Sequence, residues 1–173
     1  MSEALSGKGL VLFYSATGNT RQVAEALARA LEFDIEAIQE PTARVLSVPP
    51  QGLRGFLDFM RAGFEGFAGR RVPLLPLQRD PARYPLVLVG TPVWAGNPSS
   101  PARTFLAQHG ARLSQAAFFW TGGDDNNPKV VPTMAAVSGR PALASLGATA
   151  DQVQKGQFMA QVEALAQELA RLR

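Results

Sequence analysis

The sequence predicts a single α/β domain over residues 1–173, in which a doubly wound, five-stranded parallel sheet carries helices on both faces. Three observations predict this fold. Apolar runs of strand length alternate with segments of helical periodicity along the chain. Two of the runs, LVLFYS and LVLVGT, are apolar at nearly every position, as in strands buried on both faces. No linker, repeat or low-complexity tract interrupts the alternation.

The first half of the chain supplies two strands and two helices. Residues 10–15 form a buried strand that leads directly into a helix from about Asn19 to Leu31. Residues 33–38 alternate apolar and polar side chains, which is typical of a strand near a sheet edge. In segment 51–69 large apolar residues recur at helical spacing, and we interpret this stripe as core packing. Its members are Phe56, Phe59, Met60, Phe64 and Phe67.

The second half repeats the alternation. Residues 86–91 form the third strand, and Ser99 or Ser100 is the N-cap of the next helix, with Pro101 in its first turn. The remaining elements are a strand at 116–120, a helix starting near Asn127-Pro128, a strand within 141–149 and an amphipathic terminal helix from Asp151. The apolar positions of that last helix are Val153, Phe158, Val162, Leu165 and Leu169.

Composition excludes several classes of site. The chain has no cysteine, so disulfides, thiolate metal sites and cysteine nucleophiles are absent, and with them the small tyrosine phosphatases. Its one histidine, His109, precedes Gly110, a residue typical of helix C-caps, and we interpret it as a cation beside a helix end. One histidine without a carboxylate cluster cannot build a metal site, so we expect no metal. The sequence also contains no Ser-His or paired-carboxylate constellation, so we expect no catalytic residue.

Charge and hydropathy restrict the partners. The net charge is +3 and the arginines are scattered, so we do not expect a nucleic-acid partner. No apolar run approaches the roughly 20 residues of a membrane span, so we expect no membrane partner. The opening residues, MSEALSGKG, lack the pattern of a secretory signal, and we therefore expect a cytoplasmic protein.

Three loops rich in Gly, Thr and Asn follow the first, third and fourth strands: SATGNT, TPVWAGN and TGGDDNN. In parallel sheets ligands bind outside the carboxyl ends of the strands, where the strand order reverses. The first of these loops leads into a helix, and the free N–H groups in the first turn of a helix favour an anion. The loop also supplies hydroxyl donors from Ser15, Thr17 and Thr20, and Gly18 lets the backbone approach a ligand closely. The sequence therefore predicts an anion site at this edge.

The identity of the anion follows from a resemblance. The first loop contains neither a dinucleotide-binding fingerprint nor a P-loop, and it lacks the acidic residues of a response regulator. Residues 15–20 match the pattern T/S-x-T-G-x-T, and with GTPVWAGNPSSPARTFL and FFWTGGDD the chain resembles the flavodoxin family over essentially its whole length. The resemblance implies strand order 2-1-3-4-5 and bound FMN.

Carried over by position, the resemblance implies three groups of FMN-binding residues. A phosphate cradle would be formed by Ser15, Ala16, Thr17, Gly18, Asn19 and Thr20. The second loop would consist of Thr91, Pro92, Val93, Trp94, Ala95 and Gly96, with Trp94 stacking on the flavin and the Ala95-Gly96 peptide facing flavin N5. The pyrimidine side would be lined by Thr121, Gly122, Gly123 and Asp124, although turn chemistry alone also explains Asp124 and Asp125.

Two functions stay open at this stage. The resemblance implies an electron-transfer protein that docks with redox partner proteins or reduces a small-molecule acceptor, since the cofactor supplies the chemistry. The second loop also resembles that of flavodoxin-like NAD(P)H:quinone reductases, which makes an FMN-dependent oxidoreductase the alternative. Carrier flavodoxins tend to be acidic, whereas this chain is slightly basic. The long stretch 41–85 covers the flavin or builds a subunit contact.

Overall fold

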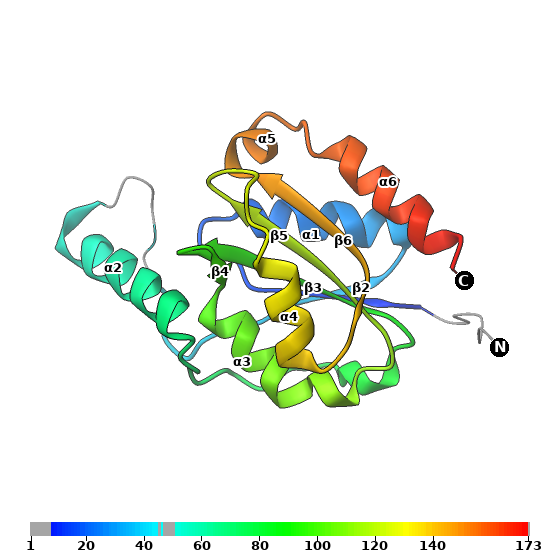
Figure 1. Ribbon diagram of the computed structural model, residues 1–173, viewed down its shortest axis with the longest axis horizontal. Helices are drawn as coiled ribbons and strands as arrows, with labels where there is room; N and C mark the ends of the chain where they lie inside the picture. The colour runs from blue at the N-terminus through cyan, green and yellow to red at the C-terminus, as the bar shows by residue number, and fades with distance from the viewer. Residues whose placement is uncertain (1–7, 45, 47–50, 173) are drawn as a thin grey trace.

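The computed structural model describes residues 8–44, 46 and 51–172, apart from the side chains of Gly66 and Phe67. In this part of the chain a parallel sheet lies between two layers of helices (Figure 1). Its parallel strands are β1 (Leu10–Phe13), β2 (Asp34–Ala37), β3 (Val87–Trp94), β5 (Ala116–Gly122) and β6 (Ala142–Thr149). They lie in the order β2-β1-β3-β5-β6, which confirms the predicted order 2-1-3-4-5. The short strand β4 (Asn97–Pro98) pairs antiparallel with β3.

The helices are α1 (Asn19–Leu31), α2 (Gly52–Ala68), α3 (Ser100–His109), α4 (Val130–Ser138), α5 (Ala150–Gln154) and α6 (Met159–Ala170). Two short 3₁₀ turns are η1 (Pro81–Arg83) and η2 (Gly110–Arg112). Helices α1, α5 and α6 cover one face of the sheet and α3 and α4 cover the other (Figure 1). None of the described helices is long and apolar enough to cross a membrane.

The core lies on both faces of the sheet because side chains of a strand alternate between them. Val11 and Phe13 of β1 pack with α1 and α6, whereas Leu10 and Leu12 pack with α3 and α4. All four side chains are at most 4% exposed. This arrangement confirms the interpretation of the continuous apolar runs as strands buried on both faces.

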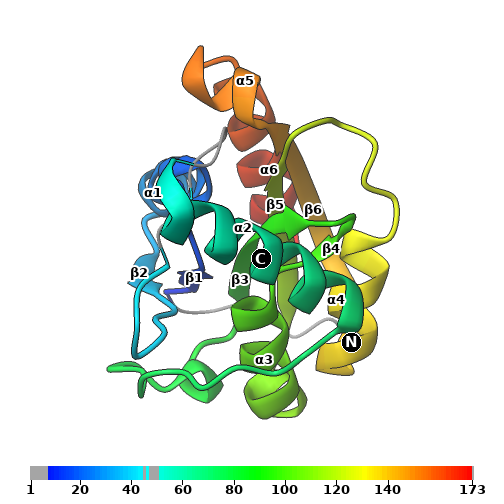
Figure 2. The ribbon, with the colours of Figure 1, turned by 90° about the vertical axis from the view of Figure 1, so that its left-hand side faces the viewer.

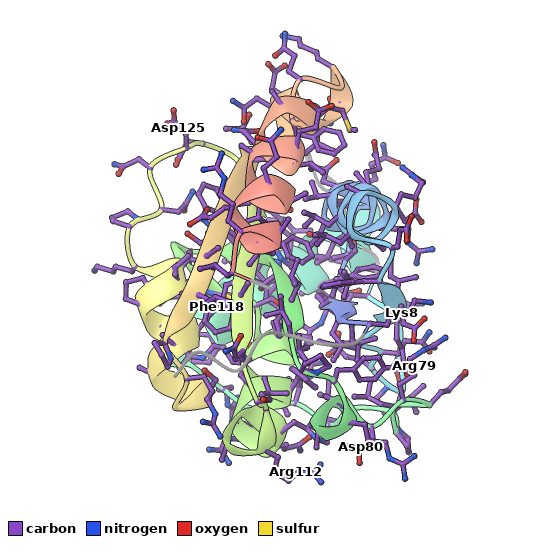
Figure 3. The ribbon with its side chains drawn as sticks, turned by 90° about the vertical axis from the view of Figure 1, so that its right-hand side faces the viewer. Lys8, Arg79, Asp80, Arg112, Phe118 and Asp125 are labelled. Carbon is purple, nitrogen blue, oxygen red and sulfur yellow. The ribbon has the colours of Figure 1, made fainter. Side chains whose placement is uncertain are left out.

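The edge strand β2 is covered by the connection that runs from α2 to β3. The backbone N–H of Leu75 donates to the carbonyl of Gln39 at 2.8 Å, and the N–H groups of Gln78 and Arg79 donate to the Glu36 carboxylate at 2.6 and 3.0 Å. Figure 3 shows Arg79 on this side of the molecule, together with Lys8. The connection therefore lies along the edge strand and covers part of it, which is one way that proteins protect an edge.

Two predicted helix boundaries require correction. The terminal helix is divided, since α5 ends at Gln154 and α6 begins at Met159, with Gly156 at φ 70° between them. All five predicted apolar positions are nevertheless buried, because the break lets both pieces follow the sheet. Helix α4 begins at Val130 rather than near Asn127-Pro128. Ser99 is the N-cap of α3 and Pro101 lies in its first turn, as predicted.

The interpretation of the aromatic stripe in α2 as core packing is wrong. Phe56, Phe59, Met60 and Phe64 are 42–60% exposed, and the side chain of Phe67 lies outside the described residues. Periodicity identifies an amphipathic helix but does not say which side turns inward. Here the opposite side of α2 is held to the protein through Glu65, which pairs with Arg44 at 2.7 Å.

Candidate functional site

The three predicted loops leave the sheet at the same edge. Parallel pairing places Phe13 of β1 beside Gly90 of β3, and Pro92 of β3 beside Thr121 of β5. The hydroxyl groups of Thr20 and Thr121 are 2.8 Å apart, which ties the first turn of α1 to the end of β5. Both side chains are buried. Residues far apart in the chain thus form one continuous surface at the carboxyl ends of the strands.

The first loop has the features of an anion site. Gly18 is the N-cap of α1 at φ 94° and provides no side-chain cap, and the first turn contains no acidic residue. Among the described residues, no partner is recorded for the backbone N–H groups of Asn19 and Thr20. A Cβ added at Gly18 would meet no atom within 4 Å, so space lies next to the loop. These donors at a helix N-terminus fit a phosphate group.

The three hydroxyl side chains of this loop have different roles. The Ser15 hydroxyl accepts hydrogen bonds from the backbone N–H groups of Gly18 and Arg21, each at 3.2 Å, and so shapes the turn. Thr20 is buried and contacts Thr121. Thr17 is exposed. Thr17 is therefore the side chain of the three that remains on the surface, where a ligand would meet it.

The second predicted loop is mostly a β-hairpin, because β3 continues to Trp94 rather than ending at Thr91. Ala95 and Gly96 have φ values of 49° and 74° and form a two-residue turn with positive φ at both positions. The Thr91 hydroxyl is 3.0 Å from that of Ser99 and accepts the Ser99 N–H at 2.9 Å. Thr91 is fully buried and holds the hairpin together, whereas the turn itself is exposed.

Trp94 lies under other side chains of the site. Its indole is 9% exposed and meets the Tyr14 ring edge-on, with centroids 5.8 Å apart. The Arg44 guanidinium lies over the indole at 5.1 Å from its centroid. In this arrangement Trp94 joins the end of β3 to the end of β1 and shows little ring surface to solvent.

The third loop begins with two buried residues, Thr121 and Gly122, at the end of β5. Gly123 and Asp124 follow and are exposed. The Asp124 carboxylate accepts the N–H of Asn126 at 3.0 Å, and the Asp124 carbonyl accepts the Asn127 amide at 2.8 Å. These bonds within the loop agree with the turn interpretation of Asp124. Figure 3 shows Asp125 at the outside of the same loop.

Beside these loops lies a buried network of charged residues that the sequence did not predict. Arg44 forms ion pairs with Glu40 at 2.6 Å and with Glu65 at 2.7 Å, and all three side chains are 6–8% exposed. The Tyr14 hydroxyl donates to Glu40 at 2.8 Å, and Arg61 pairs with Glu65 at 2.7 Å. Glu40 and Arg44, and likewise Arg61 and Glu65, are local pairs at i,i+4 spacing. The contacts of Tyr14 with Glu40 and of Arg44 with Glu65 join separate segments.

The network shifts two pKa values. Burial raises the pKa of Tyr14 well above its usual range, and the neighbouring Glu40 carboxylate adds to the effect. Burial acts to lower the pKa of Arg44, but the hydrogen bonds and charges of Glu40 and Glu65 outweigh it and raise that pKa. Tyr14 therefore stays protonated and Arg44 stays cationic at neutral pH.

His109 lies at the helix end that the sequence predicted, with Gly110 as the C-cap, but its surroundings disfavour the predicted cation. It lies in the last turn of α3, and its ring stacks on Phe105 with centroids 5.1 Å apart. Burial, and next the Arg112 charge, lower the pKa of His109, which favours the neutral imidazole. Arg112 Nη2 lies 3.0 Å from Nδ1 of that ring. The described residues contain no group of three His, Asp or Glu placed to hold a metal.

A cavity of about 440 Å³ lies away from the three loops. It is bounded by residues 74–81, which cover β2, and by the C-terminal half of α3, and its lining includes Ile38, Phe105 and His109. The features that mark the three loops as a candidate site are their hydrogen-bond donors, and this cavity does not include them.

No protein-family model and no curated protein sequence matches the chain. Solved structures do match it. A flavoprotein from Lactobacillus acidophilus NCFM in complex with FMN is 22% identical, with a TM-score of 0.66 over 87% of this chain and 98% of that one. The oxidised flavodoxin 1 of Bacillus cereus is 16% identical, with a TM-score of 0.52 over 95% and 98%. The flavodoxin, WrbA-like protein of Agrobacterium tumefaciens is 15% identical, with a TM-score of 0.53 over 97% and 100%. The chain thus has the flavodoxin-like fold.

Proposed function

We propose that the chain binds FMN at the carboxyl edge of its sheet and serves as an electron-transfer flavoprotein. One observation carries the proposal: the uncapped first turn of α1, with unpartnered N–H groups at Asn19 and Thr20, adjoins the ends of β3 and β5. Two of the similar structures support the choice of cofactor, since one is a complex with FMN and another is an oxidised flavodoxin.

The phosphate of FMN would bind at residues 15–20. The Asn19 and Thr20 N–H groups and the exposed Thr17 hydroxyl are its donors, and the α1 dipole favours its charge. No lysine or arginine is required in this arrangement, because backbone amides and a hydroxyl complete the donor set.

The isoalloxazine ring would lie between the exposed turn Ala95-Gly96 and the exposed residues Gly123 and Asp124. Bound there, the ring supplies the redox chemistry. A Cβ added at Gly96 or Gly123 meets no atom within 4 Å, which supports space on both sides. Trp94 would stack on the ring only if the Arg44 guanidinium, which Glu40 and Glu65 hold over the indole, shifted from that face.

Binding of the phosphate is tested with one pair of ligands and one pair of variants. We expect FMN to bind the apoprotein in about a one-to-one ratio and riboflavin to bind distinctly more weakly. Thr17→Ala removes a hydrogen bond to a charged group, worth about 1.5–3 kcal/mol, so FMN affinity should fall about 10- to 100-fold. The control Thr133→Ala in α4 should leave it unchanged. Equal affinities for FMN and riboflavin would reject residues 15–20 as the phosphate site.

The proposed role is tested by the electron donor. The holoprotein is mixed with NADPH or NADH without oxygen, and the flavin absorbance is followed. A carrier should stay oxidised until a separate reductase is added. Rapid direct bleaching would instead identify an NAD(P)H-dependent oxidoreductase, the alternative function on the same fold, with a small-molecule acceptor such as a quinone in place of a partner protein.

A further inference from the structure

Helix α2 presents its apolar side to solvent. Six large apolar side chains on this one helix are between 42% and 76% exposed: Leu53, Phe56, Leu57, Phe59, Met60 and Phe64. At 100° per residue they occupy one continuous stripe along the helix. Contiguous apolar surface of this kind is rare on a monomer and marks an interaction site.

The side of α2 that faces the protein is unlike the core side of an ordinary surface helix. It presents the small residues Gly55 and Ala62, both buried, and the carboxylate of Glu65, which is 6% exposed and pairs with Arg44. Helix α2 also contacts β3 and β4, and it stands in front of these strands in Figure 2. The buried ion pair thus fixes the helix with its apolar stripe turned outward.

The charges along the stripe argue against an anionic surface as the partner. Arg54 lies 3.9 Å from Asp58 and Arg61 lies 2.7 Å from Glu65, each pair at i,i+4 spacing. The two pairs balance, so α2 has no net charge to attract anionic lipid, whereas helices that bind such surfaces carry an excess of cations. A partner with a neutral apolar face fits better.

The charge pattern of α2 is complementary to itself. If two α2 helices pack antiparallel with the midpoint between Phe59 and Met60, positions whose numbers sum to 119 lie opposite each other. Asp58 then lies opposite Arg61 of the second copy, and the two-fold axis repeats this pair on the other side of the midpoint. The same midpoint falls within the apolar stripe. We propose that a second copy of this chain covers the stripe, with the two-fold axis passing between Phe59 and Met60.

The exposed area is sufficient for this contact. An aromatic side chain has about 150–250 Å² to bury, so six large side chains that are roughly half exposed offer on the order of 600 Å² per copy. Two copies would bury about 1,200 Å², the lower end of the range for stable interfaces. Because the same patch serves both chains, the contact closes after two copies.

Sedimentation tests the dimer with a matched pair of variants. We expect the wild-type chain to sediment at twice its mass of 18.5 kDa at micromolar concentration. Met60→Lys should weaken the dimer at least about 10-fold, since it places two ammonium groups at the axis. Met159→Lys, at a position 42% exposed on α6, should leave the dimer intact. Circular dichroism checks that both variants fold.

Disulfide cross-linking tests the register of the two α2 helices. Because the chain has no cysteine, each variant carries a single thiol. Met60→Cys places the two thiols about 1.5 Å apart along the helix axes, so it should form an intermolecular disulfide within the short Cα separation that such bonds need. Leu53→Cys places them about 20 Å apart along the axes and should not. A reversed result would overturn the register.

Other results would overturn the dimer itself. A wild-type chain that stays monomeric at tens of micromolar contradicts the proposal, and so does a dimer that Met60→Lys leaves unchanged. A monomer that sediments with vesicles containing anionic phosphatidylglycerol would assign the stripe to a lipid surface instead. None of these measurements requires FMN, so the dimer and the cofactor site are tested independently.

Discussion

At the scale of single residues, Ala95 is the position where the backbone is under strain. It has φ 49°, and with Glu32 it is one of two non-glycine residues with positive φ in the described part of the chain. A side chain with a Cβ is disfavoured in this region by about 1–2 kcal/mol. Glu32 ends helix α1, whereas Ala95 lies in the exposed turn that we place beside the flavin and is followed directly by Gly96.

We predict that Ala95→Gly stabilises the protein by up to about 1 kcal/mol, because glycine adopts positive φ without a steric cost. The greater conformational entropy that glycine loses on folding offsets only part of this gain. The free energy of unfolding in urea measures the change. As a control, Ala107→Gly within helix α3 should destabilise by about 0.5–1 kcal/mol. A loss of stability at both positions would show that Ala95 is not strained.

His109 allows a direct measurement, since it is the sole histidine of the chain. We predict that proton NMR of its ring gives a pKa below 6.5, as burial and the Arg112 charge require. Arg112→Gln should raise the pKa only part of the way back, because burial is the larger cause. A pKa above 6.5 in the native protein would contradict the described environment.

The same shift has a consequence for stability. The unfolded chain binds the proton at a pKa near 6.5 and the folded chain at a lower pKa, so the unfolded state binds more protons between the two values. The contribution of His109 to the free energy of unfolding therefore falls as the pH drops from about 6.5 through the folded pKa, and it is constant above that window. We therefore measure the free energy of unfolding in urea for wild type and His109→Gln across this pH range. The stability of wild type relative to His109→Gln should decrease as the pH falls.

At the scale of elements, the ion pairs of Arg44 hold α2 against the ends of β1 and β3. The guanidinium contacts Glu40, Glu65 and the Trp94 ring at once. A buried pair of this kind contributes modestly when intact, but its rupture leaves a charge without a partner. The orientation of α2, and hence of its apolar stripe, depends on this contact.

We predict that Arg44→Met destabilises the protein by about 3–5 kcal/mol, because Glu40 and Glu65 lose their shared partner inside the protein. Arg54→Met removes an arginine that is 69% exposed and lies 3.9 Å from Asp58, so it should cost at most about 1 kcal/mol. Urea denaturation of each variant at a concentration where it is monomeric compares the two. Similar losses for both variants would contradict a structural role for the network.

At the scale of the whole molecule, the three loops that we assign to FMN come from separate elements, so binding should couple to global stability. We predict that FMN at 100 times its dissociation constant raises the free energy of unfolding by about 2.7 kcal/mol. Riboflavin at the same concentration should raise it less, and Thr17→Ala should reduce the effect of FMN. An absence of stabilisation by saturating FMN would reject the proposed site.

The strand order was implied by the resemblance to the flavodoxin family and is the order observed. The sequence by itself determined the alternation of strands and helices and the common edge of the three loops. These features follow from local patterns, namely apolar runs, helix starts and the fixed handedness of parallel connections. Ser15 and Gly18 act within a few residues of each other, so a short window of sequence contains all the information that they need.

Only the tertiary structure decided how the site is covered and which side of α2 faces outward. The hydroxyl contact of Thr20 with Thr121 spans 101 positions, and Arg44 meets Glu65 from a separate segment. Neither pairing leaves a periodic signal. Amphipathic spacing in α2 is the same whether its apolar side faces the core or a second chain, because periodicity records the difference between two sides and not their direction. A buried ion pair made that choice, and its partners meet only after the sheet has formed.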